Sequence, residues 1–339
     1  MNILLTCAGR RNYLVNYFKE ALRGSGKVIA TDVQLNAPAL VDADIAFKVP
    51  SIYDETYISN LLSICKENNV KALVSLNDLE LPIIAANKSL FAEVGVTAIV
   101  SDTSVIDICF DKWNTKKFLD SIGVNAPQTY ITLSDALDAI HNQEVRFPLI
   151  IKPRWGSASI GIECVENEEE LKLTYKLLSL RLNRTILGEV SKNSINQAIL
   201  IQERLSGQEY GMDVFNDLNG NYIASFAKKK LAMRDGETDK AQTVSDERFH
   251  VLGAKLGKGL KHLGNLDCDV FETSKGLYIL ELNPRFGGGY PFTHESGVNI
   301  PGALVKMLSG NQDITKYMNI SSGKAFAKCD RMVEIPVEP

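Results

Sequence analysis

The residues best suited to chemistry in this chain are two acids, an amide and an arginine in its C-terminal part. Glu281, Asn283 and Arg285 stand at alternate positions, and Asp267 precedes Glu281 by fourteen residues. Carboxylate and amide oxygens suit Mg²⁺, which takes few protein ligands and completes its shell with water and phosphate. Arg285 adds a fixed positive charge. The set predicts a metal and phosphate site.

Two adjacent strands would bring these residues together. Asp267 alternates with apolar neighbours in one segment, and in the next Ile279, Glu281 and Asn283 alternate with Leu280. Because side chains alternate between the faces of a strand, Ile279, Glu281 and Asn283 are expected on one face. Residues 274–276 can turn one strand into the other. An ordinary hairpin with an acidic outer face is the alternative.

A second set of residues predicts phosphate binding. Lys152 ends an apolar strand and is followed by small residues over 156–161. Such a loop can bring backbone N–H groups onto phosphate oxygens while a lysine supplies a point charge. It is not a P-loop, because no Gly-Lys-Ser/Thr opens a helix behind it. A purely structural hairpin of small residues is the alternative.

The first hundred residues alternate apolar strands with helical stretches, which predicts a parallel sheet. Dinucleotide binding is not favoured, because one glycine, Gly9, follows the first strand instead of Gly-x-Gly-x-x-Gly, and Asp32 alone resembles a ribose-binding acid. A helix is expected over 105–122, with Gly123 as its stop. A domain boundary fits near residue 103.

In order and spacing, these residues resemble the ATP-grasp superfamily, in particular its carbamoyl-phosphate-synthase-like, carboxylate-amine ligase group. The resemblance covers essentially the whole chain. It implies an α/β fold that is α+β in the ATP-grasp part. Residues 1–103 would be a Rossmann-like parallel-sheet domain, 104–197 the small lobe with the phosphate loop, and 198–339 the large lobe with the metal site.

The resemblance also implies roles for single residues. Lys112 and Lys152 are similar to the two nucleotide-binding lysines, and Lys152 and Arg285 would act catalytically on the reacting phosphate. Asp267 and Glu281 would bind Mg²⁺, with Mn²⁺ as an alternative, and Asn283 a second ion. The remaining residues implied in ATP binding are Ser157, Ser159 and Gly161 in a lid over the triphosphate, Gln202, Glu203 and Leu205 at the adenine, and Glu209 at the ribose.

Each match has a structural alternative. Lys112 and Lys116 could form a solvated helix face, and Glu209 could pair with a surface lysine. Many relatives carry a Glu-Lys-like pair where this chain has Gln202 and Glu203, so the adenine contacts are less well defined than the metal contacts.

The implied activity is that of an ATP-dependent ligase, which activates a carboxylate as an acyl phosphate and joins it to an amine or another nucleophile. Two alternatives stay open: an enzyme that releases an acyl or carbamoyl phosphate, and a non-catalytic nucleotide-binding regulatory subunit. The expected partners are a small carboxylate and a small nucleophile, and a homodimer is an open possibility.

Residues near the expected site could define the substrate. His294 follows the glycines 287–289 and could be a base or a surface residue. Asp78 closes a strand of the N-terminal domain, where open parallel sheets present ligands; alternatively it caps a helix. Lys228, Lys230 and Arg234 could meet phosphate or form a solvated basic face.

Composition narrows the classes of protein. The chain has 339 residues, 45% of them hydrophobic and 23% charged, and a net charge of −4. This is ordinary for a globular enzyme and gives no basic field for nucleic acid. No apolar run approaches the roughly 18 residues of a membrane span. Six scattered cysteines predict reduced core thiols in a cytoplasmic protein.

Overall fold

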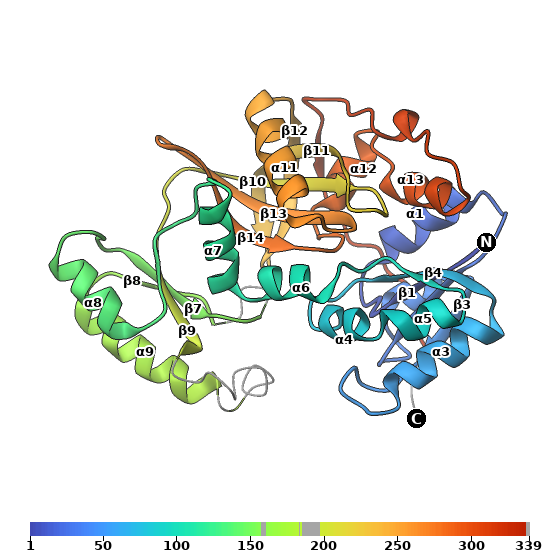
Figure 1. The fold of residues 1–339 in the computed structure, drawn as a ribbon, viewed down its shortest axis with the longest axis horizontal. Coiled ribbons are helices and arrows are strands. Elements are labelled where there is room, and N and C mark those ends of the chain that lie inside the picture. Colours follow the sequence, from blue (N-terminus) through green and yellow to red (C-terminus); the bar gives the residue numbers. More distant parts are fainter. Residues whose placement is uncertain (157–160, 183, 185–196, 337–339) are drawn as a thin grey trace.

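The structure is a computed structural model that describes residues 1–156, 161–182, 184 and 197–336. The described residues form three sheets with helices packed on them, and the N-terminal domain and the sheet of the large lobe lie against each other while the small lobe projects to one side (Figure 1).

The N-terminal domain has the parallel sheet that the sequence predicts. Its strands, in the order β3-β2-β1-β4-β5, are β1 (Asn2–Thr6), β2 (Val28–Asp32), β3 (Ile45–Lys48), β4 (Val70–Ser75) and β5 (Thr97–Ala98). Its helices are α1 (Asn12–Leu22), α2 (Pro38–Asp42), α3 (Tyr57–Glu67), α4 (Leu81–Ala86) and α5 (Lys88–Glu93). Asp32 accepts a 2.9 Å hydrogen bond from the Gly9 backbone N–H. Its carboxylate therefore stabilises the turn after β1.

The single helix expected over 105–122 is two helices. They are α6 (Thr103–Phe110) and α7 (Lys112–Ser121), and the break falls at Asp111. The Asp111 side chain caps α7 by accepting from the backbone N–H groups of Trp113 and Asn114. An aspartate at an N-cap begins a new helix, which the helical periodicity alone does not reveal. Both helices pack on the sheet of the large lobe.

The small lobe contains a four-stranded sheet in the order β6-β9-β7-β8. Its elements are β6 (Thr129–Tyr130), α8 (Leu133–His141), β7 (Leu149–Pro153), β8 (Glu163–Val165), α9 (Glu168–Leu182) and β9 (Ile199–Glu203). Strand β9 lies beyond residue 197, so this sheet extends to Glu203. Ile151 and Ile201 are fully buried between the sheet and its two helices.

The large lobe contains an antiparallel sheet in the order β14-β13-β10-β11-β12-β15. Its strands are β10 (Gln208–Asn216), β11 (Tyr222–Arg234), β12 (Glu237–Val244), β13 (Gly264–Thr273), β14 (Gly276–Asn283) and β15 (Ala325–Ala327). Helix α11 (Glu247–Leu260) covers one face, and α12 (Tyr290–Glu295), α13 (Ile300–Leu308) and the 3₁₀ turn η2 (Thr315–Tyr317) follow β14. One parallel sheet in the N-terminal domain and two antiparallel sheets in the lobes confirm the expected fold class.

The N-terminal domain and the large lobe share one hydrophobic core. Phe18 of α1 is fully buried with Phe286, Tyr290 and Leu304 of the large lobe. Helix α13 lies beside α1 (Figure 1). This common core holds the carboxyl ends of β1 and β4 against the loop that follows β14.

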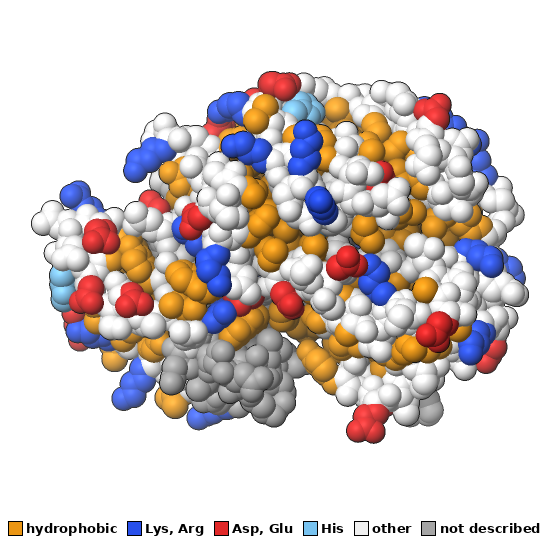
Figure 2. Space-filling view, viewed as in Figure 1, with side chains coloured by type: hydrophobic (Ala, Val, Ile, Leu, Met, Phe, Trp, Pro, Cys, Tyr) orange, Lys and Arg blue, Asp and Glu red, His pale blue; other side chains and the backbone are white. Residues whose placement is uncertain are grey.

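Two composition-based expectations can be compared with the described residues. Cys65, Cys109 and Cys268 are buried thiols as expected, but Cys164 and Cys329 are exposed and are not core residues. None of the described helices combines the length and apolar character needed to cross a membrane. On the face drawn in Figure 2, basic and acidic side chains are interspersed over the described surface, in keeping with the small net charge.

Candidate active site

The metal-binding candidates lie on one face of two neighbouring strands, next to Asp213 of a third. Asp267 of β13 is directly opposite Asn283 of β14 and opposite Asp213 of β10, while Asp269 is opposite Glu281. Directly opposed residues of antiparallel strands project to the same side of a sheet. The hairpin therefore brings Asp267, Glu281 and Asn283 to one face, as the sequence predicts.

One detail of that prediction is wrong. Ile279 does not share the face of Glu281 and Asn283, because the register shifts between Asp269 and Val270 and leaves Leu280 as an extra residue in β14. Ile279 is 1% exposed and packs in the core beneath the sheet with Leu282. A β-bulge adds one residue to one strand and thereby reverses the alternation beyond it.

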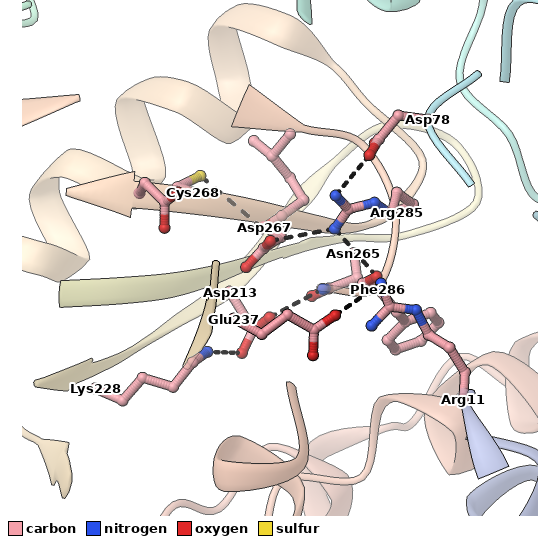
Figure 3. A network of polar contacts seen from close by, with 12 residues as sticks. Arg11, Asp78, Asp213, Lys228, Glu237, Asn265, Asp267, Cys268, Arg285 and Phe286 are labelled. Atoms are coloured by element: carbon pink, nitrogen blue, oxygen red, sulfur yellow. Dashed lines mark hydrogen bonds and ion pairs between the residues drawn. The ribbon is translucent and has the colours of Figure 1, made fainter. Parts of the chain in front are cut away.

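Arg285 connects the sheet face that carries Asp267, Glu281 and Asn283 (the metal face) to the N-terminal domain. Its Nη2 donates to Asp78 Oδ2 at 2.7 Å, and its Nη1 donates to Asp267 Oδ2 and to the Phe286 carbonyl, each at 3.2 Å (Figure 3). Burial alone would lower the pKa of Arg285, but Asp78 and Asp267 raise it, so the guanidinium stays charged. Its Nε has no hydrogen-bond partner among the described residues.

Asp78 does not cap a helix, which was one of the two interpretations of this residue. Helix α4 begins after Glu80, and the Asp78 carboxylate bonds to Arg285 instead. The adjacent Glu80 is fully buried and accepts hydrogen bonds from Thr6, Ser75 and Tyr57. These contacts anchor the loop that carries Asp78.

The donor set fits a hard divalent cation. Burial raises the pKa of Asp267 to about 6; Arg285 lowers it, and Asp269 and Asp213 raise it. A carboxyl surrounded by other carboxyls gains from a bound cation, which favours its ionised form. In the described part of the chain no cluster of three or more His, Cys, Asp or Glu side chains has metal-binding geometry. Two carboxylates with an amide match what Mg²⁺ takes from proteins.

Glycines cover this face closely. A Cβ atom at Gly287 would lie 2.1 Å from the Asp267 side chain, and one at Gly289 would lie 2.8 Å from Lys228. Any larger residue at position 287 would displace the carboxylate. The close approach of the backbone to Asp267 thus requires glycine at position 287.

The two nucleotide-binding lysine candidates reach the same region from different elements. Lys112, the first residue of α7, lies 3.1 Å from Glu281 and donates to the Gly156 carbonyl. Lys152 of β7 donates to Gln202 Oε1 at 2.7 Å. The Lys112 side chain is largely buried next to Glu281 and is not part of a solvated helix face. Lys116 instead pairs with Asp120 on the exposed side of the helix.

The environment of Lys152 changes its acidity. Burial lowers its pKa to about 8, the charge of Lys112 acts in the same direction, and Glu281 and Asp269 oppose the shift. Lys152 therefore loses its proton more readily than an exposed lysine.

Asp111 and Arg154 were not identified from the sequence, yet their ion pair links the helix that begins at Lys112 to the strand that carries Lys152. Arg154 donates to both carboxylate oxygens of Asp111, at 2.7 and 2.6 Å. Arg154 follows the strand of Lys152, and Asp111 caps the helix that begins at Lys112. Asp111 preceding a helix is a recognisable capping signal, but its pairing with Arg154 spans 43 residues.

A small cavity lies where these elements meet. Its polar lining comes from Asp78, Lys112, Gly156, Glu281 and Asn283, and apolar side chains of α6 close its other side. Residues of the N-terminal domain, the helix start at Lys112 and the end of β14 therefore face one space.

Lys228 and Lys230 do not form a solvated basic face. Lys228 is 1% exposed and lies 2.5 Å from Asp213, and Lys230 lies 2.5 Å from Glu209 and 2.6 Å from Asp269. Burial alone would lower the pKa of Lys230, but Asp269 and Glu209 raise it. The alternative holds for Arg234, which pairs with Asp330 on the surface.

The remaining described nucleotide candidates are Gly161 and the β9 residues Gln202 and Glu203 in the small lobe, Leu205 after β9, and Glu209 of β10 in the large lobe. Gln202 holds Lys152 and also donates to Thr129, while Glu203 pairs through its backbone with Gln128. Leu205 is half-buried between β9 and β10, and the Glu209 carboxylate accepts from Lys230, a buried lysine and not a surface one. Gly161 has φ of +72°, and Ser157 and Ser159 lie outside the described residues.

Arg11 and Tyr13 of the N-terminal domain lie near Glu237 of β12, whose carboxylate lies beside the glycine loop. Arg11 Nη1 donates to the Tyr13 hydroxyl at 2.7 Å, and its Nη2 lies 3.7 Å from Glu237. Burial would raise the pKa of Glu237, but Arg11, Lys328 and Arg285 lower it overall. Sequence reasoning did not identify this group, because its members come from distant parts of the chain.

His294 contacts two tyrosines, one of them in α1. Its ring stacks on Tyr17 with centroids 3.5 Å apart, and its Nδ1 lies 3.1 Å from the Tyr290 hydroxyl. Burial lowers the pKa of His294 to about 4, so the ring is neutral at neutral pH. Its contacts join α12 to α1.

Comparison with known proteins is consistent with this geometry. Residues 3–99 match the family model of the PylC-like N-terminal domain, and residues 196–328 match the model "ATP-grasp in the biosynthetic pathway with Ter operon".

Solved structures share the fold over nearly the whole chain. The biotin carboxylase domain of Hydrogenobacter thermophilus 2-oxoglutarate carboxylase, solved with MgADP and bicarbonate, is 18% identical with a TM-score of 0.74, covering 96% of this chain and 73% of that one. Biotin carboxylase from Campylobacter jejuni is 17% identical with a TM-score of 0.75, covering 96% and 74%. An L-amino acid ligase from Bacillus licheniformis is 17% identical with a TM-score of 0.71, covering 95% and 78%.

At these identities the solved structures establish the fold alone, and the family models add the sequence relationship. Residues 196–328, which carry the acids and amide of β13 and β14 and the arginine that follows them, therefore belong to an ATP-grasp family, and residues 3–99 belong to the PylC-like N-terminal domain family.

Proposed function

We propose that this protein is an ATP-dependent ligase that activates a carboxylate as an acyl phosphate and joins it to an amine or another nucleophile. The observation that carries the proposal is the shared cavity: Lys112, Glu281 and Asn283 line it together with Asp78, which holds Arg285. Lys112, which could bind a triphosphate, therefore lies close to Arg285, which could bind a second anion.

The residues divide the work of phosphoryl transfer. Lys112 and Lys152 bind the phosphates of ATP, and Asp267, Glu281 and Asn283 hold Mg²⁺, which when bound with ATP supplies positive charge to the phosphate oxygens. Lys112 then exchanges its contact with Glu281 for one with phosphate. Lys230, held by Glu209 and Asp269, adds a further cation beside the metal face.

Arg285 orients the acceptor. Its charge is maintained by Asp78 and Asp267, and it faces the place where negative charge develops during transfer. No covalent nucleophile from the protein is needed, because positioning and electrostatic stabilisation provide most of the catalysis in phosphoryl transfer.

Small molecules are the proposed partners. A homodimer and a cytoplasmic location are also proposed, the location on the basis of six unpaired cysteines.

Phosphate release from ATP, measured with pooled carboxylic acids in the presence and absence of pooled amines, tests this function. We expect release that requires both pools, and transfer of oxygen-18 from labelled carboxylate into phosphate. A free phosphorylated product that accumulates regardless of amines would instead identify an acyl-phosphate-forming enzyme. Absence of turnover with every pool, despite ATP binding, would identify a regulatory nucleotide-binding protein.

A further inference from the structure

Arg11 and Glu237 are opposite charges that face each other without forming a hydrogen bond. Arg11 belongs to the turn after β1, and Glu237 is the first residue of β12. Their nitrogen and oxygen atoms are 3.7 Å apart (Figure 3). This distance exceeds the usual hydrogen-bond range.

Other arginine–carboxylate pairs in the protein are closer. Arg154 lies 2.6 Å from Asp111, Arg285 lies 2.7 Å from Asp78, and Arg331 lies 2.6 Å from Asp42. The separation of Arg11 and Glu237 is thus a property of this pair.

Each member of the pair is oriented by another residue. The Tyr13 hydroxyl accepts from Arg11, and Lys328 donates to Glu237 at 3.0 Å. A guanidinium has five N–H donors and a carboxylate has about four acceptor positions. Both groups therefore retain hydrogen-bonding capacity that these contacts do not use. Their side chains are 20% and 53% exposed, so a ligand can reach them.

The pair lies next to the proposed reaction site. A Cβ atom at Gly288, three residues after Arg285, would be 2.9 Å from the Glu237 carboxylate. The charge of Arg285 acts on both Arg11 and Glu237. A molecule that contacts both exposed groups would therefore lie next to the glycine loop that follows Arg285.

We infer that Arg11 and Glu237 recognise the head group of an α-amino acid, with Arg11 binding its carboxylate and Glu237 its ammonium group. An α-amino acid carries both charges on one carbon, so its site must offer the opposite charges within a few ångströms of each other. A simple carboxylate would satisfy Arg11 and leave Glu237 without a counter-charge. The inference rests on the proposed function and narrows its substrate class.

Binding measurements test this without requiring turnover. Saturation-transfer NMR with common α-amino acids, each beside the matched acid without the amino group, is run with a non-hydrolysable ATP analogue and Mg²⁺. We expect at least one amino acid to bind, and Glu237→Gln to weaken it about tenfold or more, as for loss of a charge-assisted contact. The matched acid should change less than about twofold, because it makes no ammonium contact.

Two further variants complete the design. Arg11→Gln should weaken the amino acid and the matched acid alike. Arg234→Gln, in the same β11–β12 hairpin but paired with Asp330 on the surface, should leave binding unchanged.

The outcomes separate this inference from the proposed function. Equal weakening of both ligands by Glu237→Gln, or binding of plain acids but of no amino acid, overturns the inference; phosphate release with plain acids would then leave the ligase function standing. Amino-acid binding that depends on Glu237 without any ATP turnover supports the inference and removes the ligase function. Absence of binding by every probe overturns the inference as well.

Discussion

Asp78 of the N-terminal domain accepts a 2.7 Å hydrogen bond from Arg285 of the large lobe, across 207 residues of sequence. Asp78 Oδ1 is buried and has no partner among the described residues, so one oxygen of this carboxylate is fully engaged by the guanidinium and the other is free. The N-terminal domain thereby sets the direction of Arg285, the arginine that we propose orients the acceptor.

Asp78→Asn should reduce turnover at saturating ATP by about tenfold or more, because an amide holds the guanidinium less strongly than a carboxylate does. Steady-state phosphate release measures the effect. Asp102→Asn, which removes the exposed pair with Lys88, is the matched control and should retain normal turnover. Equal rates for both variants would show that Asp78 does not orient Arg285.

Asp267→Asn and Glu281→Gln should each abolish Mg²⁺-dependent turnover, since each removes an anionic ligand with little change of volume. Titration of turnover with Mg²⁺ and circular dichroism of the fold provide the measurements. Glu272→Gln is the control: Glu272 lies near the end of β13, the strand of Asp267, and pairs with Arg248. This variant should behave as wild type. Activity within about twofold of wild type in both acid variants would refute the metal site.

Gly287→Ala should lower turnover by about a hundredfold, because the added Cβ displaces Asp267 and a shift of about 1 Å at a catalytic group has effects of this size. Gly259→Ala in α11 serves as control, since its Cβ would meet neighbouring side chains at 3.2 Å or more. Retained turnover in the Gly287 variant would mean that Asp267 can move without consequence.

ATP affinity should weaken as the pH rises above 8. We expect phosphate to bind the protonated form of Lys152, whose pKa is lowered to about 8 by burial. Calorimetry with an ATP analogue should show the dissociation constant rising by up to about tenfold per pH unit. Lys152→Arg, which stays charged, should show a flat profile over the same range. A flat profile in the wild type would exclude a direct contact of Lys152 with phosphate.

The same group has the opposite effect on the nucleotide-free fold. An unfolded lysine has a pKa of about 10.4, so between pH 8 and about 10 the unfolded chain binds more protons than the folded one. The contribution of Lys152 to the free energy of unfolding should therefore rise with pH in this window. Urea denaturation of wild type and Lys152→Met at several pH values measures the difference.

Local patterns in the sequence predict the parts of the site that depend on neighbouring residues. The alternation around Asp267 and Glu281 correctly predicts two paired strands with the acids on one face. The same rule fails at Ile279, because a bulge depends on how two strands pair and not on the composition of one. The break at Asp111 is missed for a similar reason: apolar periodicity continues through it, and the capping side chain alone marks the new helix.

Contacts between distant segments are not encoded in spacing. Asp78 with Arg285, Asp111 with Arg154 and Arg11 with Glu237 each depend on how the domains pack. Lys228 and Lys230 show the same limit, since a basic run in the sequence gives no indication that acids on neighbouring strands pair with it.

The core common to the N-terminal domain and the large lobe has a consequence for work with fragments. Cutting the chain near residue 103 would expose Phe18 on one piece and Phe286, Tyr290 and Leu304 on the other. Each fragment would carry an apolar surface of the kind that drives aggregation. Co-expression of the two pieces should restore a soluble complex, whereas exchanging the N-terminal domain for one from another protein would require redesign of the face that meets α13.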